Sequence, residues 1–538
     1  MNFKTTKRSI LILLSIFLIK YSIAENPIFT QRYTADPSGM EYNGRLYIYA
    51  SHDIDGQTNY SMNDITCIST NDMVNWTDHG EVCKVPANAS WATQAWAPSV
   101  VFRNNKFYMY FGDGNRSVAV ALSDNPTGPF GDAKGSAVIT KSLPNCDVPW
   151  CYDPSVFVDD DGQAYCYFGG GDPKGDNTLF NARVIKLGEN MISTVGDAVT
   201  IPAPGFFEGG HIHKRTVNGI KKYYFSFFRN LNGIKIDYMM SDNPMTGWVS
   251  KGIALNTLPD NMSNNSQAGI FSFGDKWYIA YHNRKLAIDR GVTNMRQRSV
   301  CVDELNYNAD FTIKTAVLTS SGPAQIGSVD PFVRNEAETM SSQSFLLPGI
   351  ETIPSTDIDG NRVVTEIDNG DWVKISGVDF GSGASSFTTR VSSATNGGDI
   401  EIRLDSENGT LAGTCIVDNT GDWNKWTTKN CNLVTSITGK HDLFLKFTGG
   451  AGFLFNLNWW KFSQNETALN DQFESSQLKV IQNKNGVYKL SESIECTVFN
   501  IQGLAIFSGE DSEIDLSNCN KGIYILKTRN RPFKLINK

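Results

Sequence analysis

Asp153-Pro154-Ser155, followed by Ala164-Tyr165-Cys166-Tyr167, is the stretch of this 538-residue chain that decides the fold, because both halves of it recur. Five times in residues 1–300 a tyrosine stands inside a short apolar run, and the steps between these tyrosines are 61, 57, 59 and 54 residues. A nearly constant period built from short aromatic strands predicts a five-bladed β-propeller. The five residues are Tyr47, Tyr108, Tyr165, Tyr224 and Tyr278.

The other half of the stretch places acidic residues at equivalent points of the repeat. A residue followed by Pro-Ser stands 11, 11 and 12 residues ahead of the first three tyrosines, and Glu208 precedes the fourth. In a propeller the first strand of each blade lines the central channel, so equivalent side chains converge on the axis. The pattern predicts that Asp36, Asp153 and Glu208 meet in one pocket. Ala97, at the same place in the second blade, shows that the repeat does not require an acid there.

Three carboxyl groups in one pocket suit inverting glycoside hydrolysis. One carboxylic acid protonates the leaving oxygen, and a second carboxylate, about 6.5–9.5 Å away, activates water. A third charge raises the pKa of the acid by repulsion. One aspartate would be the base, Glu208 the acid and the other aspartate the modulator. Asp-Pro also opens turns, so spacing alone leaves a structural interpretation open.

Composition and the N-terminus indicate an exported protein. Residues 1–24 combine early basic residues, an apolar run from Ile10 to Ile19 and a small-residue cleavage site, Ser22-Ile23-Ala24, which is typical of a signal peptide. The run is too short to span a bilayer, and we expect no membrane span elsewhere. The formal net charge is −8 without a basic cluster, which argues against nucleic acid as a partner. We expect a secreted or cell-surface protein.

The ten cysteines are compatible with disulfides in an exported chain, although their connectivity does not follow from sequence. Cys415 with Cys431 and Cys496 with Cys519 are the pairings to test first, since each lies inside one expected domain. Cys146-Cys151 has the spacing of a structural staple rather than of a metal site.

The chain divides into three all-β parts after the leader. Residues 27–320 hold the propeller, and Ser321-Gly322-Pro323 has the composition of a linker. Residues 333–463 contain short strands separated by glycine turns, which predicts a β-sandwich of the jelly-roll kind. Residues 477–538 again contain short strands and predict a small C-terminal β-sandwich.

Five spaced motifs of the propeller follow one another in a recognisable order: Asp36-Pro37-Ser38, Trp96-Ala97-Pro98-Ser99, Tyr152-Asp153-Pro154-Ser155, Phe207-Glu208-Gly209 and Tyr281-His282-Asn283-Arg284. Together they resemble the motif series of glycoside hydrolase family 43 over nearly the whole propeller. The resemblance implies that Asp36 is the general base, Glu208 the general acid and Asp153 the pKa modulator. Members act on plant polysaccharides that contain arabinose or xylose.

The same resemblance implies three further substrate-site residues. Trp96 would wall the sugar subsite and Arg284 would lie near the sugar. His282 would lie near the axis, where some members hold a calcium ion. A channel histidine bonded to water and a tryptophan that packs between blades are equally compatible with the sequence.

The second domain is similar to carbohydrate-binding module family 6, on the motifs Glu336-Ala337-Glu338, Asn369-Gly370-Asp371-Trp372, Gly421-Asp422-Trp423 and Asn456-Leu457-Asn458. The resemblance implies that a sugar stacks on Trp423 and bonds to Asn456. It also implies a structural calcium at Glu336, Glu338 and Asn458, since oxygen ligands suit that ion. Glu366 stands where many relatives carry a second stacking aromatic, which predicts weaker binding of xylan.

The last segment resembles the C-terminal sorting domain of type IX secretion, on Val498-Phe499-Asn500, Asp515-Leu516-Ser517 and Lys521-Gly522-Ile523-Tyr524. This implies the secretion machinery as a partner. A third sugar-binding sandwich is the alternative.

These features together predict an enzyme that removes α-L-arabinofuranosyl groups from arabinoxylan with inversion and without a catalytic cofactor. A β-1,4-xylosidase is the nearest alternative, because arabinofuranose and xylopyranose present hydroxyls in similar places. A non-catalytic carbohydrate-binding propeller is the alternative from another class.

Overall fold

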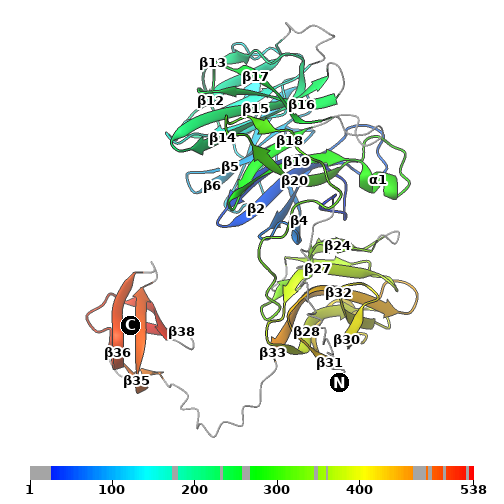
Figure 1. Ribbon diagram of the computed structural model, residues 1–538, viewed down its shortest axis with the longest axis vertical. Coiled ribbons are helices and arrows are strands. Elements are labelled where there is room, and N and C mark those ends of the chain that lie inside the picture. Colours follow the sequence, from blue (N-terminus) through cyan, green and yellow to red (C-terminus); the bar gives the residue numbers. More distant parts are fainter. Residues whose placement is uncertain are drawn as a thin grey trace, which may run out of the picture. The chain divides into compact units, whose positions relative to one another are not determined.

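The computed structural model describes residues 26–171, 180–230, 234–256, 267–344, 349–358, 361–464, 480–482, 487–500, 504–528 and 532–537. The leader expected at residues 1–24 lies outside these ranges. The chain forms two compact units that meet in sequence between Asn465 and Glu466. The described secondary structure is almost entirely β, with one short helix, α1 (Lys285–Asp289), as Figure 1 shows. No helix in the described ranges is both long enough and apolar enough to cross a membrane.

Five antiparallel sheets form the propeller, and the repeated tyrosine lies in the second strand of each. This confirms the predicted fold and the period that gave it. The first two blades are β1 (Thr34–Tyr42), β2 (Arg45–His52), β3 (Asp64–Thr70) and β4 (Trp76–Lys84), then β5 (Trp96–Arg103), β6 (Lys106–Gly112) and β7 (Ser117–Ser123) with the short β8 (Gly131–Asp132) and β9 (Ile139–Thr140).

The remaining three blades have four strands each, in the same order from the channel outward. They are drawn in cyan to green in Figure 1. Their strands are β10 (Ser155–Val158), β11 (Ala164–Gly169), β12 (Ala182–Leu187) and β13 (Thr194–Ile201); β14 (Phe206–Val217), β15 (Ile220–Asn230), β16 (Ile234–Ser241) and β17 (Val249–Leu255); and β18 (Ala268–Phe273), β19 (Lys276–Asn283), β20 (Ser299–Tyr307) and β21 (Ile313–Lys314).

A tyrosine of the second strand joins each of the first four blades to the next; one of them, Tyr224, belongs to the repeat named above, and the other three follow its tyrosines by two residues. In each of the first four blades a buried tyrosine of the second strand donates its hydroxyl to a backbone carbonyl of the following blade. Two of the four acceptors are prolines in the repeated Asp-Asn-Pro turns. A buried tyrosine needs such a partner for its hydroxyl, and each of these four tyrosines has one. The pairs are Tyr49–Pro126, Tyr110–Met191, Tyr167–Pro244 and Tyr224–Phe311.

A second ring of contacts closes the propeller next to the channel. In each innermost strand, one backbone amide donates a hydrogen bond to a side chain of the preceding blade. A buried amide without a hydrogen-bond partner costs free energy. Each of these contacts gives a partner to one amide on the inner edge of a sheet. The donors and acceptors are Ala97 N to Ser51 Oγ (2.8 Å), Val156 N to Ser99 Oγ (2.9 Å), Ile212 N to Ser155 Oγ (3.1 Å), Ile270 N to His211 Nε2 (2.9 Å) and Asp36 N to His282 Nδ1 (3.1 Å).

The residue before Pro-Ser has a left-handed backbone in all three copies of the motif. The φ angles of Asp36, Ala97 and Asp153 are 53°, 47° and 49°. Non-glycine residues rarely adopt this conformation, and the strand register shifts at two of the three sites, as in a β-bulge. The bulge turns the side chain away from its strand, which is how the sequence motif aims a side chain into the channel.

The module that follows is a sandwich of two antiparallel sheets, and Figure 1 colours its strands yellow to orange. Its core is a single cluster of buried apolar residues, and a disulfide joins Cys415 to Cys431, as the sequence suggested. One sheet is β25 (Glu351–Pro354), β26 (Arg362–Thr365), β33 (Asn456–Gln464), β28 (Ala384–Ser393) and β31 (Asp422–Ile437), with β22 (Asn335–Glu336); the other is β24 (Ser342–Gln343), β27 (Trp372–Asp379), β32 (Lys440–Gly449), β29 (Gly398–Leu404) and β30 (Thr410–Val417).

The module is joined to the first blade by more than the linker. Strand β23 (Thr339–Met340) pairs with β4 and so extends the sheet of blade one. Behind this pairing Asp78 is fully buried, and its carboxylate contacts Arg32 of the propeller (2.7 Å) and Arg362 of the module (3.4 Å). The two guanidinium groups, with Thr352 and the amide of Gly80, outweigh the effect of burial and lower the pKa of Asp78.

The second compact unit is a small five-stranded sheet. The expectation that Cys496 bonds to Cys519 is wrong, because both thiols are free. Cys496 is buried in the core of this unit and Cys519 packs beside it. Cys146 and Cys151 are also free and buried, so they form no staple. The strands are β34 (Val480–Gln482), β35 (Val487–Asn500), β36 (Ala505–Asp515), β37 (Gly522–Thr528) and β38 (Pro532–Asn537).

The inner ring predicts a measurable cost for losing one acceptor. Ser155→Ala leaves the buried amide of Ile212 without its partner, so we expect the free energy of unfolding to fall by about 1–3 kcal/mol. Ser142→Ala, at an exposed serine outside the ring, is the matched control and should change it by less than about 0.5 kcal/mol. Urea unfolding followed by tryptophan fluorescence measures both. Equal stability of the two variants would contradict a structural role for the ring.

Candidate active site

A cavity of about 380 Å³ opens where the predicted acids converge. Asp36, Asp153 and Glu208 all line it, as the repeat predicted. Asp36 belongs to β1 and Glu208 to β14, while Asp153 lies in the turn directly before β10. The two aspartates are 6% and 4% exposed, and Glu208 is half-buried. Residues 172 positions apart in the chain are therefore on the walls of one cavity.

Asp36 is held from three sides. Ser51 donates its hydroxyl to Oδ2 (3.0 Å) and Arg298 donates Nη1 to Oδ1 (3.0 Å). The backbone amide of Asp36 donates to His282 Nδ1, as described above. The carboxylate is thus fixed in orientation and its negative charge is balanced, which suits a group that must accept a proton from water.

Arg298 is a site residue that the sequence analysis missed. It is 1% exposed, lines the cavity, and forms a bidentate pair with Asp53 (2.8 Å) besides its contact with Asp36. The two carboxylates raise the pKa of its guanidinium against the effect of burial. The sequence does contain a signal for it: a basic residue directly precedes the run Ser299-Val300-Cys301-Val302. A charge next to a buried strand needs a partner, because burying it unpaired is costly.

Asp153 and Glu208 are neighbouring acidic residues of the same cavity. Burial raises the pKa of Asp153 well above its usual range, and the charges of Glu208 and Asp36 raise it further. The amide of Gly209 donates to Asp153 Oδ2 (2.9 Å), and the hydroxyl of Tyr152 donates to Glu208 Oε2. Because the charge of Glu208 acts on Asp153, the deprotonated form of Asp153 is disfavoured.

An arc of aromatic rings forms the rest of the wall. Neighbouring ring centroids along it are 6.5, 6.4, 5.9 and 5.0 Å apart. Trp96 is among these rings, so it lines the cavity where the sequence analysis expected it. Flat rings beside a few polar groups are the usual construction of a site for a small polar ligand. In order, the arc consists of Tyr60, Trp96, Tyr152, Trp150 and Phe207.

His282 and Arg284 do not line this cavity. His282 is fully buried behind Asp36 and accepts the amide of that residue, so it supports the site from outside. Arg284 is 2% exposed and donates to the carbonyls of Val292 (3.2 Å) and Asn294 (2.7 Å). Its expected place near the sugar is therefore corrected: it fixes the loop after α1, because it lies one residue beyond the end of β19, outside the cavity lining.

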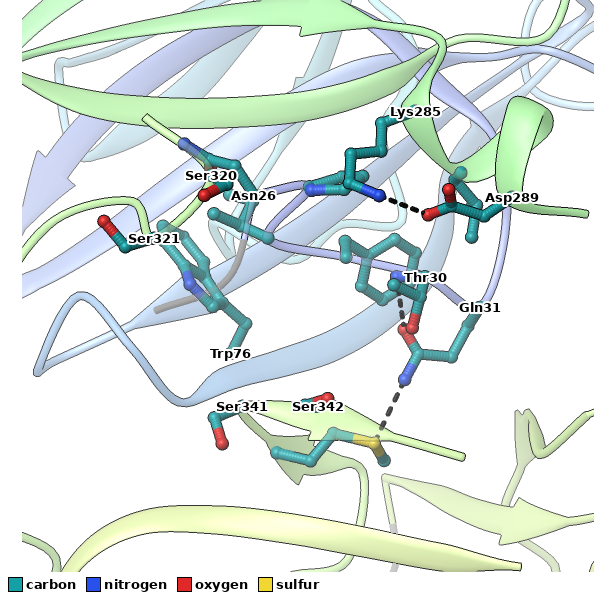
Figure 2. Close-up of a pocket in the computed structure, with 15 residues that line it drawn as sticks. Asn26, Thr30, Gln31, Trp76, Lys285, Asp289, Ser320, Ser321, Ser341 and Ser342 are labelled. Carbon is teal, nitrogen blue, oxygen red and sulfur yellow. Dashed lines mark hydrogen bonds and ion pairs between the residues drawn. The ribbon is translucent and has the colours of Figure 1, made fainter. Parts of the chain in front are cut away.

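A second cavity, of about 420 Å³, lies between the propeller and the module and has a different character (Figure 2). Its acidic group, Asp289, is paired with Lys285 (2.7 Å), and Gln31 reaches across to the sulfur of Met340 (3.1 Å). Without a second carboxylate on its lining it offers no acid and base, and the chemistry remains with the first cavity.

In the module, Trp423 and Asn456 lie together as expected. The side-chain amide of Asn456 donates to the backbone carbonyl of Trp423 (3.3 Å), while its oxygen accepts from Thr365 (2.8 Å). Trp423 is half-buried at the start of β31. Glu366, where the sequence analysis expected a second aromatic to be missing, has a left-handed backbone with a φ of 55°.

The three expected calcium ligands of the module differ in their bonding. Glu338 Oε2 and Asn458 Oδ1 are buried and have no hydrogen-bond partner among the described residues. The two residues are close, because Ala337 N donates to Asn458 O (2.9 Å). Burial raises the pKa of Glu338 to about 8. Glu336 is paired with Arg334 (2.7 Å). Two orphaned buried oxygens fit a hard cation, which takes oxygen ligands.

The propeller channel gives no comparable support for a metal. Among the described residues, the one cluster of three histidine, cysteine or acidic side chains within ligand distance is His52, Asp64 and Glu81, on strands β2 to β4. His52 Nδ1 is 2.9 Å from Asp64 in that cluster, and Glu81 is paired with Lys84. His282 Nδ1 accepts the amide of Asp36, and a calcium ion near His282 stays a prediction.

Comparison with known proteins gives matches to both domains. The family described as glycosyl hydrolases family 43 matches residues 24–313, and the carbohydrate binding module (family 6) matches residues 336–464.

Two relatives carry the name arabinoxylan arabinofuranohydrolase. The one from Paenibacillus polymyxa is 38% identical over 483 residues, or 82% of this chain and 74% of the relative. The one from Bacillus subtilis (strain 168) is 37% identical over 491 residues, or 84% of this chain and 94% of the relative. A crystal structure of a glycoside hydrolase family 43 arabinoxylan arabinofuranohydrolase from Bacillus subtilis in complex with cellotetraose superposes with a TM-score of 0.75, at 36% identity, over 82% of this chain and 99% of that chain.

The buried pairing of Arg298 predicts a large loss of stability when the cation is removed. Arg298→Gln leaves the carboxylates of Asp36 and Asp53 without their partner, so we expect the free energy of unfolding to fall by about 3–5 kcal/mol. Lys276→Gln breaks an exposed pair with Glu304 and should cost less than about 1 kcal/mol. Chemical denaturation of the two variants, side by side, measures the difference. Similar losses would mean that the buried charges are not held as described.

Proposed function

Because the chain belongs to glycosyl hydrolase family 43 and carries a family 6 carbohydrate-binding module, we propose that it releases α-L-arabinofuranosyl side groups from arabinoxylan by a single displacement with inversion. The observation that carries this proposal is the convergence of Asp36, Asp153 and Glu208 on one aromatic-walled cavity. Inversion needs an acid and a base on separate walls with room for water between them.

Asp36 acts as the general base. It removes a proton from a water molecule, whose oxygen attacks the anomeric carbon as the bond to the leaving oxygen breaks. Ser51 and Arg298 hold the two carboxylate oxygens, so the group is oriented before substrate arrives. Pre-orientation of this kind lowers the barrier because it does not have to occur during the reaction.

Glu208 acts as the general acid and Asp153 as its modulator. A proton passes from Glu208 to the leaving oxygen of the xylan backbone. Asp153 faces Glu208 from the turn before β10 and is fixed by Gly209 N, so its charge keeps a proton available near neutral pH. The leaving xylose hydroxyl takes this proton, and arabinose leaves with the oxygen of water at its anomeric carbon.

The module would hold the enzyme on xylan through Trp423 and Asn456. A calcium ion held by Glu338 and Asn458, with Glu336 beside them, would satisfy the orphaned oxygens and stabilise the module. The single aromatic platform, with Glu366 opposite, predicts modest affinity. This arrangement keeps the catalytic domain near a substrate that is insoluble or dilute.

The ends of the chain would direct the protein out of the cell. Residues 1–24 supply the signal for export, and residues 477–538 resemble a type IX sorting domain that the secretion machinery would recognise. The substrate is a polysaccharide outside the cell, so a secreted or cell-surface location agrees with the proposed activity.

The proposal predicts that wheat arabinoxylan yields arabinose, and that Glu208→Ala and Asp36→Ala each reduce kcat/KM by at least about 10³-fold while binding of the polysaccharide persists. Product analysis by anion-exchange chromatography measures the release. Ser142→Ala is the matched control and should retain full activity. Xylose as the main product would favour a β-xylosidase, and an unchanged rate in Glu208→Ala would exclude the assigned acid.

The calcium site predicts a metal-dependent melting temperature. Calcium should stabilise the full-length protein relative to EDTA, by about 2–4 kcal/mol at 100- to 1,000-fold excess over the dissociation constant. Glu338→Gln should lose most of this response, whereas Glu407→Gln, at a partly exposed residue of the same module, should keep it. Differential scanning fluorimetry measures the shift. An identical melting temperature with calcium and with EDTA would contradict the site.

A further inference from the structure

Tyr152 stands beside the three acids of the cavity. It immediately precedes Asp153, and its ring lines the cavity. Its hydroxyl donates a hydrogen bond to Oε2 of Glu208. The contact joins the turn before β10 to β14, across the boundary between the third and fourth blades.

The ring of Tyr152 is locked in place. It is 6% exposed and has Trp96 and Trp150 edge-on at 6.4 and 5.9 Å. Gly170 lies against its other edge, where a Cβ atom would come within 2.6 Å of Cε1, and the carbonyl of Tyr152 accepts the amide of Gly169 (3.0 Å). The hydroxyl therefore has one direction in which to point, toward Glu208.

The hydroxyl is also a permanent donor. Burial raises the pKa of Tyr152 well above its usual value, and the charges of Glu208 and Asp153 raise it further. Tyr152 thus keeps its own proton throughout the working pH range and cannot replace Glu208 as the acid.

We propose that Tyr152 is a positioning residue for the general acid: it holds Oε2 of Glu208, directs Oε1 to the leaving oxygen, and stabilises the carboxylate that forms when the proton leaves. The inference rests on the proposed function. A hydrogen bond to a carboxylate is about twice as strong as one to a neutral acid, so the Tyr152 contact strengthens during proton transfer. The proton moves from Glu208 to the glycosidic oxygen as the carbon–oxygen bond breaks, and the phenol proton stays on Tyr152.

The experiment compares Tyr152→Phe with wild type on two substrates that need different amounts of proton donation. Arabinoxylan has a sugar alcohol as its leaving group, and kcat should fall about 10- to 100-fold, as expected for one hydrogen bond to a charged group. 4-Nitrophenyl α-L-arabinofuranoside has a leaving group that needs little protonation, and its kcat should fall by less than about 3-fold. KM should change little for either.

The pH profile supplies a second readout. Without the donor, the carboxylate form of the acid is less stable, so the alkaline limb of kcat on arabinoxylan should move to higher pH in Tyr152→Phe. Tyr110→Phe is the matched control: its hydroxyl is equally buried and donates to the carbonyl of Met191, but it does not line the cavity. It should leave the substrate ratio and the alkaline limb unchanged.

Equal losses on both substrates, with an unmoved alkaline limb, would overturn the inference and leave Tyr152 a packing residue. So would wild-type activity of Tyr152→Phe on arabinoxylan. Failure of the proposed function looks different, since wild type itself would then release no arabinose and Glu208→Ala would change nothing.

Discussion

Closure of the propeller depends on satisfying the free inner edge of five sheets. In each case a serine or histidine of one blade accepts an amide of the next blade, and the ring is complete when His282 of the fifth blade accepts the amide of Asp36 in the first. The bulge that exposes this amide also turns the carboxylate of Asp36 into the cavity. Asp36 therefore has two functions: its backbone amide completes the ring, and its side chain is the proposed base.

The charges around the cavity divide it into two halves with different chemistry. The positive charge of Arg298 offsets the negative charges of Asp36 and Asp53, so burying these carboxylates costs less free energy. Asp153 and Glu208 repel one another, and the groups that donate to them, Gly209 N and the Tyr152 hydroxyl, carry no charge. Two carboxyl groups with environments that differ in this way can serve as base and acid at the same pH.

The sequence predicted the features of the fold and of the site that the repeat determines. The period of the tyrosines led to the five blades, and register within the repeat brought Asp36, Asp153 and Glu208 together, because equivalent positions must converge on an axis. Arg298 was missed because its partners are 245 and 262 residues away and no repeat position marks it. Arg284 was placed wrongly because it is close to His282 in sequence. That closeness does not show which way the chain runs after β19. Tyr152 was quoted with its motif, but a hydroxyl that reaches the neighbouring blade cannot be read from one strand.

Ring closure brings Asp36, the proposed base, and Glu208, the proposed acid, to the lining of one cavity, where the proposed reaction is a single displacement. Proton NMR of the first sugar released from arabinoxylan, recorded before mutarotation, tests it most directly. The account predicts that β-L-arabinofuranose appears first, from a linkage of the α configuration, because one displacement inverts the anomeric carbon. Initial formation of the α anomer would require two displacements and a nucleophile on the enzyme, and it would contradict the account.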